Sequence, residues 1–421
     1  MIQTFSLFPG ITLRCCRDTR FKQGCLSFQL VRPMCLEESA MNALLPSVLL
    51  RGTRQHGDLR AITNRLDELY GASVSAVVRR IGDYQTTGLY CGFMDDRFAL
   101  PGDRVLQPML DFLGELLLES PLENGGFPTA FVESEKKNLI ATIESELNDK
   151  RAYAMGRLLR TMCREDTFGL PRLGDKEQVA VIDPVFLYDH YQHILRESPI
   201  EIFYVGSEEG EQVASLLKPL LSRLDRDYRS LKPQTAFHSC EGSDLTETME
   251  ISQGKLCMGF VTPITNRTPE FPAMQMLNTI FGSGMTSKLF MNIREKLSLC
   301  YSIGSGYYGS KGIVTVSAGI DFDKEELTRQ EMLRQLKDCQ DGHISEDELT
   351  AARQAILSSL RSTHDSPGSI EGYYATAALS GMKMTPAEYM AAVEAVTKEQ
   401  VVAAANSLQL HTTYFLKGGS Q

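Results

Sequence analysis

The sequence predicts an α+β protein made of two duplicated domains, each an antiparallel sheet covered by helices. Three observations support this fold class. The chain has 421 residues, of which 43% are hydrophobic, enough for two separate cores. Two long segments match each other at one constant spacing. Strand-like runs follow one another and helix-like runs are grouped, as in α+β folds rather than in alternating βαβ units.

The internal repeat has an offset of 230 residues and continues without a gap over the first part of each copy. The run "FKQGCLSFQLVRP" superposes on "SQGKLCMGFVTP". The matched pairs are Gln23 and Gln253, Gly24 and Gly254, Leu26 and Leu256, Pro33 and Pro263, Gly52 and Gly282, and Leu69 and Leu299. Each copy therefore follows one plan: an alternating strand, a helix ending at glycine, an amphipathic helix and then further strands.

The individual elements follow from hydrophobic periodicity. In the first copy we expect a helix in "NALLPSVLLRGT", an amphipathic helix in "LRAITNRLDELYG" and a buried final strand in "PIEIFYVGS". The second copy repeats this with the helix "TSKLFMNIREKLS" and the strands "GKLCMGFVT", "LCYSIGSGYYG", "GIVTVSAGI" and "HTTYFLKG". Two further helices are expected in "DKEELTRQEMLRQLKDCQDG" and "SEDELTAARQAILSSLRSTHD".

The boundary between the copies is expected in a polar segment at about 227–246, which contains proline, glycine and serine. We therefore predict an N-terminal domain over 1–230 and a C-terminal domain over 231–421.

Composition and charge exclude several classes of function. The 43 basic and 53 acidic residues give a formal charge of -10 and are spread along the chain, which argues against nucleic acid or an anionic membrane as partner. The N-terminus lacks the basic and apolar regions of a signal peptide, and no apolar window approaches the roughly 18 residues of a membrane span. The expected location is the cytoplasm. Ten cysteines without a Cys-x-x-Cys pair are expected to be small buried residues, although a cysteine nucleophile stays open.

The first domain resembles that of the pitrilysin and insulinase-like zinc peptidases. The resemblance lies in the helix before Gly52-Thr53 and in the following "LDELYGASVSA". In that family this helix carries His-x-x-Glu-His, with two zinc ligands and a general base. Counting back from Gly52-Thr53 places Ala43, Pro46 and Ser47 on the first ligand, the base and the second ligand. Proline should also kink the helix.

The third ligand of the family is a glutamate on a later helix, which resembles "ESEKKNLIATIESELNDKRAYA" here. Aligning Glu135 with the family's upstream glutamate puts Thr142 on the ligand position, with Glu144 and Glu146 nearby. Alanine offers no lone pair and a hydroxyl is a poor zinc ligand. The resemblance therefore implies that this chain holds no metal.

The second domain keeps the family's pattern in "FGSGMTSKLFMNIREKLSLCYSIGSG". Arg294 and Tyr301 fall on the family's substrate-binding arginine and tyrosine, and the turn Gly282, Ser283 and Gly284 would contact the peptide. A guanidinium can donate to a substrate carbonyl, and a phenol can donate to an oxyanion. The alternative from the residues alone is a solvated charge at Arg294 and a core tyrosine at Tyr301, on one strand face with Leu299 and Ile303.

Three other motifs have ordinary explanations. "GSGYYG" at 304–309 follows a strand without opening a helix, so it is a poor dinucleotide site. His190 and His193 could share one helix turn, but no third metal ligand is evident. The turn "FGSGM" could hold an anion or simply close a helix.

The resemblance spans nearly the whole chain and is strongest to bacterial family members that lack the zinc motif and accompany a zinc-bearing relative. It implies a zinc-free subunit of a heterodimeric metallopeptidase, forming half of a clamshell around a peptide. Arg294 and Tyr301 would complete a site whose zinc comes from a His-x-x-Glu-His paralogue. Two alternatives remain: a peptide-binding or scaffold protein of the same fold, and a self-sufficient hydrolase using a cysteine or another metal.

Overall fold

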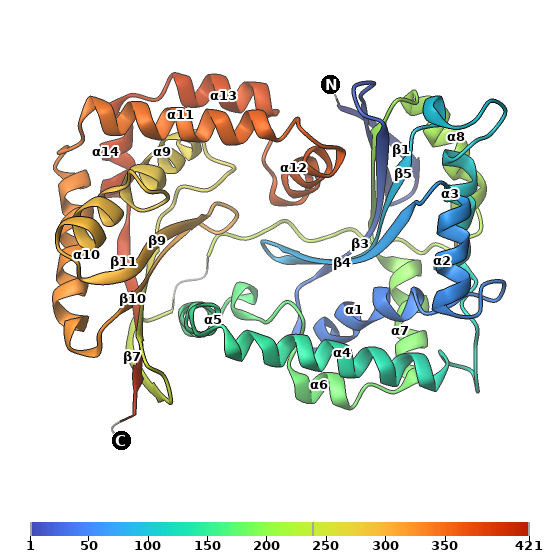
Figure 1. Cartoon of the computed structure of the whole chain (residues 1–421), viewed down its shortest axis with the longest axis horizontal. Helices are drawn as coiled ribbons and strands as arrows, with labels where there is room; N and C mark the ends of the chain where they lie inside the picture. The colour runs from blue at the N-terminus through green and yellow to red at the C-terminus, as the bar shows by residue number, and fades with distance from the viewer. Residues whose placement is uncertain (1, 238–239, 420–421) are drawn as a thin grey trace. The chain divides into compact units, whose positions relative to one another are not determined.

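The computed structural model of the chain describes residues 2–237 and 240–419, apart from the side chain of residue 147 (Figure 1). The chain forms two compact units. Unit 1 contains Met1–Glu144, Leu170–Pro233 and His364–Thr376, and unit 2 contains Ser145–Gly169, Gln234–Thr363 and Ala377–Gln421. Each unit therefore includes one segment from the other half of the sequence. The domain limits 1–230 and 231–421 stay a prediction.

Unit 1 is built on a six-stranded sheet with the order β1-β2-β6-β3-β5-β4. Its strands are β1 (Ile2–Phe8), β2 (Ile11–Arg17), β3 (Gln23–Pro33), β4 (Ser73–Ile81), β5 (Tyr84–Met94) and β6 (Ile200–Gly206). Neighbouring strands are antiparallel except β2 and β6, which are parallel.

Unit 2 contains a five-stranded sheet with the order β7-β11-β8-β10-β9. Its strands are β7 (Ser243–Met249), β8 (Gly254–Val261), β9 (Cys300–Tyr308), β10 (Ile313–Ile320) and β11 (Gln409–Gly418). The order and directions repeat those of β2-β6-β3-β5-β4, including the one parallel pair, β7 with β11. The predicted α+β class with two helix-flanked sheets is confirmed. The sheets are mixed rather than wholly antiparallel, because β2 pairs in parallel with β6 in unit 1 and β7 pairs in parallel with β11 in unit 2.

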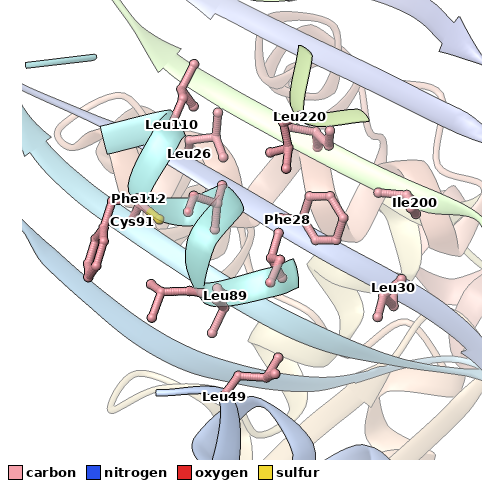
Figure 2. Close-up of a cluster of buried hydrophobic side chains, with 14 of the residues drawn as sticks. Leu26, Phe28, Leu30, Leu49, Leu89, Cys91, Leu110, Phe112, Ile200 and Leu220 are labelled. Carbon is pink, nitrogen blue, oxygen red and sulfur yellow. The ribbon is translucent and has the colours of Figure 1, made fainter. Parts of the chain in front are cut away.

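The core of unit 1 lies between its sheet and a layer of helices (Figure 2). The helices of this unit are α1 (Leu36–Leu49), α2 (Leu59–Glu68), α3 (Leu106–Leu118), α4 (Thr129–Asn148, up to Glu144), α6 (Lys176–Ala180), α7 (Pro184–Glu197), α8 (Gly210–Leu221) and the 3₁₀ turn η1 (Asp96–Phe98). Leu26, Phe28 and Leu30 alternate along β3 and point into this core, as the period of a strand requires.

The opposite face of this sheet is covered by the start of α12 (Pro367–Ser380), which comes from the other half of the sequence. Ile370 packs with Cys25 and Val205. The Glu371 carboxylate accepts hydrogen bonds from the Ser27 hydroxyl at 2.6 Å and from the Arg79 guanidinium at 2.8 Å.

Unit 2 has helices on both faces of its sheet. They are α5 (Lys150–Met162), α9 (Phe271–Phe281), α10 (Glu325–Gln340), α11 (Glu346–Ser362), α13 (Pro386–Glu394), α14 (Lys398–Asn406) and the short helices η2 (Thr167–Gly169), η3 (Leu289–Lys296) and η4 (Phe322–Lys324). Ala154 and Leu158 of α5 pack with Cys257, Tyr414 and Leu416 of the sheet. In Figure 1, α9, α10, α11 and α14 lie together on the side of the sheet away from α5.

The predicted linker forms a strand at its end, because β7 begins at Ser243. Residues 238–239 of that segment lie outside the described residues. In the described part of the chain, no helix combines the length and apolar composition that a bilayer crossing requires.

Helix α1 runs through Pro46 without interruption, because the carbonyl that proline leaves free finds another donor. Proline has no N–H for the carbonyl of Asn42, four residues earlier. That oxygen instead accepts a hydrogen bond from the Thr87 hydroxyl of β5 at 2.6 Å. The hydroxyl of a buried strand residue therefore replaces the backbone hydrogen bond that the helix lacks at this turn.

The Thr87→Val variant should lose about 1–3 kcal/mol of unfolding free energy, because the buried Asn42 carbonyl would have no donor. Urea denaturation measures the loss. The neighbouring Thr86 is equally buried, and its hydroxyl has no hydrogen-bond partner in the described structure. Thr86→Val is therefore the matched control and should be neutral or slightly stabilising. An equal loss in both variants would contradict this explanation.

Candidate functional site

The three zinc-motif positions on α1 hold residues that do not fit a metal. Ala43 is only 5% exposed and Pro46 is buried, so a methyl group and a pyrrolidine ring stand where the resemblance expects a ligand and a base. Ser47 is half-buried and offers only a neutral hydroxyl.

The position predicted for the third ligand is no better suited. Thr142 on α4 is exposed, and its hydroxyl donates to the Asn138 carbonyl at 2.9 Å, within its own helix. The carboxylates of Glu135 and Glu144 form ion pairs, Glu135 with the Arg51 guanidinium at 3.3 Å and Glu144 with the Lys176 ammonium at 3.0 Å. No group of three or more His, Cys, Asp or Glu side chains able to hold a metal occurs among the described residues.

A neutral hydrogen-bond network lies beside the lost motif. The Asn42 amide donates to the Gln85 side-chain oxygen at 2.9 Å, and its own oxygen lies 2.7 Å from Nε2 of His190. Gln85 in turn donates to the Ser39 carbonyl at 3.0 Å. This network was not predicted from the sequence, although Gln85-Thr86-Thr87 within a buried strand was a signal. His190 is thus tied to α1 instead of lying free on a surface helix.

Burial in this network lowers the pKa of His190 to about 4, with Arg32 and His193 adding to the effect and Glu38 opposing it. The neutral ring is therefore the folded form, whereas the unfolded chain takes up a proton near pH 6.5. The contribution of His190 to the free energy of unfolding should be constant above pH 6.5 and should fall as the pH is lowered from about 6.5 to about 4. Hydrogen bonds to Arg32 hold the Glu38 pKa below its usual value against the effect of burial, which adds a further loss below about pH 4.5.

The His190→Gln variant should flatten this dependence, because the amide can still donate to Asn42 but cannot titrate. Urea midpoints at pH 7, 5.5 and 4.5 measure it. His343→Gln is the control, since His343 is exposed beside Asp338. A variant that loses as much stability as the parent chain over this pH range would contradict the assignment.

The predicted turn in unit 2 joins α9 to η3. Gly282 is buried and ends α9, and a Cβ there would come within 2.7 Å of the Ser305 hydroxyl oxygen, so this glycine is required sterically. Gly284 has φ +136°, a conformation that other residues rarely adopt. Ser283 and Gly284 are exposed, and Met285 beside them is 76% exposed.

Arg294 lies on a π-helix, η3, whereas an α-helix was predicted over 286–298. The matching element of the first copy, α2, is a regular α-helix. In η3 the Leu297 amide donates to the carbonyl of Asn292, five residues earlier, and the Asn292 side chain donates to Gln335 of α10 at 2.7 Å. π-Helices are rare and occur frequently at functional sites. The Arg294 guanidinium lies 4.7 Å from the ring centre of Phe290, and its side chain is 41% exposed.

Tyr301 is 62% exposed, so the alternative of a core tyrosine is wrong. The register explains why: Gly319 of β10 pairs with Ser302 and Ile320 with Cys300, which leaves Tyr301 as the extra residue of a bulge. Its hydroxyl donates to Asp321 at 2.9 Å, and this hydrogen bond raises the pKa of Tyr301. Tyr301 contacts Asp321 and Arg294 contacts Phe290, and both side chains are exposed around the junction of η3 and β9.

Exposed apolar side chains surround these two polar residues. Met285, Met291 and Leu297 are 76%, 49% and 42% exposed, all within the segment from the turn to β9. Flexible methionines are common on surfaces that bind peptides of varied sequence. The segment 282–301 therefore combines two exposed polar side chains, Arg294 and Tyr301, with adaptable apolar contacts.

The remaining motifs give no separate site. "GSGYYG" lies mainly within β9 and opens no helix. His193 lies 3.3 Å from Glu197 on α7. All ten cysteines are free thiols, and burial raises the pKa of Cys25 and of Cys257 to about 12, so neither is an active nucleophile.

Comparison with known proteins identifies the family. The family "Peptidase M16 inactive domain" matches residues 183–356, which include Arg294 and Tyr301. "Probable inactive metalloprotease YmfF" of Bacillus subtilis (strain 168) is 30% identical over 409 residues, covering 97% of this chain and 96% of that protein.

Two solved structures have the same fold. A conserved protein from Enterococcus faecalis V583 superposes with a TM-score of 0.92 at 26% identity, covering 100% of this chain and 99% of that one. A peptidase M16 inactive domain from Pseudomonas fluorescens superposes with a TM-score of 0.81 at 17% identity, covering 100% and 98%. The chain belongs to the peptidase M16 family, the pitrilysin and insulinase-like metallopeptidases, and is similar to members described as inactive.

Proposed function

We propose that this chain is the zinc-free subunit of a heterodimeric zinc metallopeptidase, in which it binds the peptide substrate and contributes Arg294 and Tyr301 to the partner's active site. One observation carries the proposal: the chain has a buried alanine and proline on zinc-motif positions, yet it exposes both donors of the second domain.

Each residue has a defined role in this proposal. The Arg294 guanidinium would donate to a main-chain carbonyl of the bound peptide and so fix its register. The Tyr301 hydroxyl would exchange Asp321 for the oxyanion that forms when water attacks the peptide carbonyl, replacing one charge-assisted hydrogen bond with another. The zinc and the general base belong to the partner, a paralogue with His-x-x-Glu-His. We propose the cytoplasm as location, where buried free thiols stay reduced.

The second candidate is a peptide-binding or scaffold protein of the same fold. It is favoured by the contact between Tyr301 and Asp321, since a tyrosine already bound by its own chain is less available to an oxyanion. A self-sufficient hydrolase has less support, because burial raises the pKa of the Cys25 and Cys257 thiols and no group of three or more metal-ligating side chains occurs among the described residues.

The test is reconstitution. The isolated chain should contain no stoichiometric zinc by elemental analysis and should cleave no peptide. Coexpression with a His-x-x-Glu-His paralogue should give a 1:1 complex by light scattering that holds one zinc and cleaves a peptide library. One tightly bound zinc per isolated chain, or hydrolysis without a partner, would overturn the proposal.

A further inference from the structure

Unit 1 contains a cavity of about 540 Å³ that the proposed peptidase role does not use. It is lined by residues of α2, α3 and α8 and by the loop that follows α1. In Figure 1 these three helices are seen on the same side of the six-stranded sheet. None of the zinc-motif positions lines the cavity. Its volume is within the range of 300–1,000 Å³ typical of small-molecule sites.

The most buried charged group of the lining is the Glu115 carboxylate, in a residue that is 8% exposed. Its Oε1 accepts a hydrogen bond from the Thr53 hydroxyl and lies 2.7 Å from Nδ1 of His56. Both partners therefore occupy one oxygen, and the second oxygen, Oε2, has no partner among the described residues.

His56 adds a second acceptor. An ionised carboxylate can only accept, so Nδ1 carries the proton that His56 donates to Glu115. In the neutral imidazole the other ring nitrogen, Nε2, is then a lone-pair acceptor on a side chain that is 24% exposed and lines the cavity. An edge contact with Phe112, with ring centres 5.5 Å apart, orients the imidazole.

The charges of the lining favour a cation. Its two arginines are already paired, Arg65 with Glu68 at 3.0 Å and Arg223 with Glu119 at 2.7 Å. Glu115 lacks a permanently charged partner, and the same is true of Asp111 among the described residues. Since the four lining carboxylates face only two arginines, two negative charges remain. An anion would be repelled, and no set of three metal ligands occurs among the described side chains.

We propose that this cavity binds an alkylammonium group, whether of a free amine or of a lysine side chain. The ammonium has three N–H donors and would bind Glu115 Oε2 and His56 Nε2. Its alkyl stem would lie against the apolar wall formed by Leu110, Leu216 and Leu220. The proposal is independent of the peptidase role, since every group lies in unit 1 and none belongs to the zinc-motif or Arg294 regions.

The test uses the isolated full chain, with 1,5-diaminopentane and Nα-acetyl-lysine methylamide as probes and glutarate as the anionic control. Calorimetry should detect at least one amine binding at concentrations up to about 10 mM, with no binding of glutarate. The NMR signal of His56 Nε2 should shift on binding. Binding of the diamine alone assigns the site to free amines, and binding of the lysine derivative assigns it to peptide lysines.

Variants separate this site from general surface charge. Glu115→Gln should weaken amine binding by about tenfold or more, since it removes a charge-assisted hydrogen bond. Asp111→Asn lies on an exposed position, should fold normally and should weaken binding about threefold through charge alone. Glu211→Gln, at the exposed start of α8 outside the cavity, should change nothing. Absence of amine binding, equal binding of glutarate, or unchanged affinity in Glu115→Gln and Asp111→Asn would overturn the proposal.

Discussion

The Tyr301→Phe variant, reconstituted with a zinc-bearing partner, is expected to lose about 10²- to 10³-fold in kcat, the usual effect of removing one oxyanion donor. The Arg294→Met variant should mainly raise KM, because a contact to a substrate carbonyl is made before and during the reaction. Steady-state cleavage of a fluorogenic peptide measures both. The complex should stay intact by light scattering, since both side chains are exposed.

A matched control exists in unit 1. Tyr70 is also an exposed tyrosine whose hydroxyl donates to an aspartate, Asp103. Tyr70→Phe should leave kcat and KM unchanged. If Tyr301→Phe and Arg294→Met also leave turnover unchanged in an assembled pair, the scaffold alternative is correct and the catalytic role is wrong.

The largest stability effect is expected for Lys311→Met in unit 2. The Lys311 ammonium lies 2.9 Å from the Asp166 carboxylate, and the two side chains are 0% and 1% exposed. Removing the lysine takes one member away from a buried ion pair, which costs about 3–5 kcal/mol. Urea unfolding of the full chain measures it. The added Asp166→Asn substitution should recover part of the loss, because it removes the buried negative charge that Lys311 had balanced.

The control for that experiment is Lys337→Met, which deletes the same charge from an exposed pair. Lys337 and Asp341 lie 2.6 Å apart, with side chains 63% and 42% exposed. Such pairs contribute about 0–1 kcal/mol. Similar effects of the two substitutions would show that burial of the Lys311 pair does not matter for stability.

Much of the fold could be predicted because the residues that match at an offset of 230 occupy equivalent positions in the two units. Leu26 and Leu256 lie on the central strands of the two sheets, and Gly52 and Gly282 follow equivalent helices. What could not be predicted is which sheet α5 and the start of α12 cover. Helical periodicity shows that a helix has an apolar face, but not which of two apolar surfaces receives it.

The candidate site was predictable in its residue types but not in its geometry. The pattern of Arg294 and Tyr301 was readable from the resemblance, whereas the π-helix and the bulge depend on tertiary hydrogen bonds such as that from Asn292 to Gln335. Strand alternation placed Tyr301 on the face of Ile303, and one extra residue in the register turned it outward. Likewise, Pro46 indicated that one helical carbonyl would lose its donor, but only the folded sheet supplies the Thr87 hydroxyl that replaces it.

The exchange of segments between the units bears on how the chain can be divided into two fragments. A break at 238–239 would then leave one fragment without residues His364–Thr376 and the other without Ser145–Gly169. Neither fragment could complete its own unit, yet each would carry the segment that the other lacks. Folded protein should therefore be obtained only when the two fragments are synthesised together.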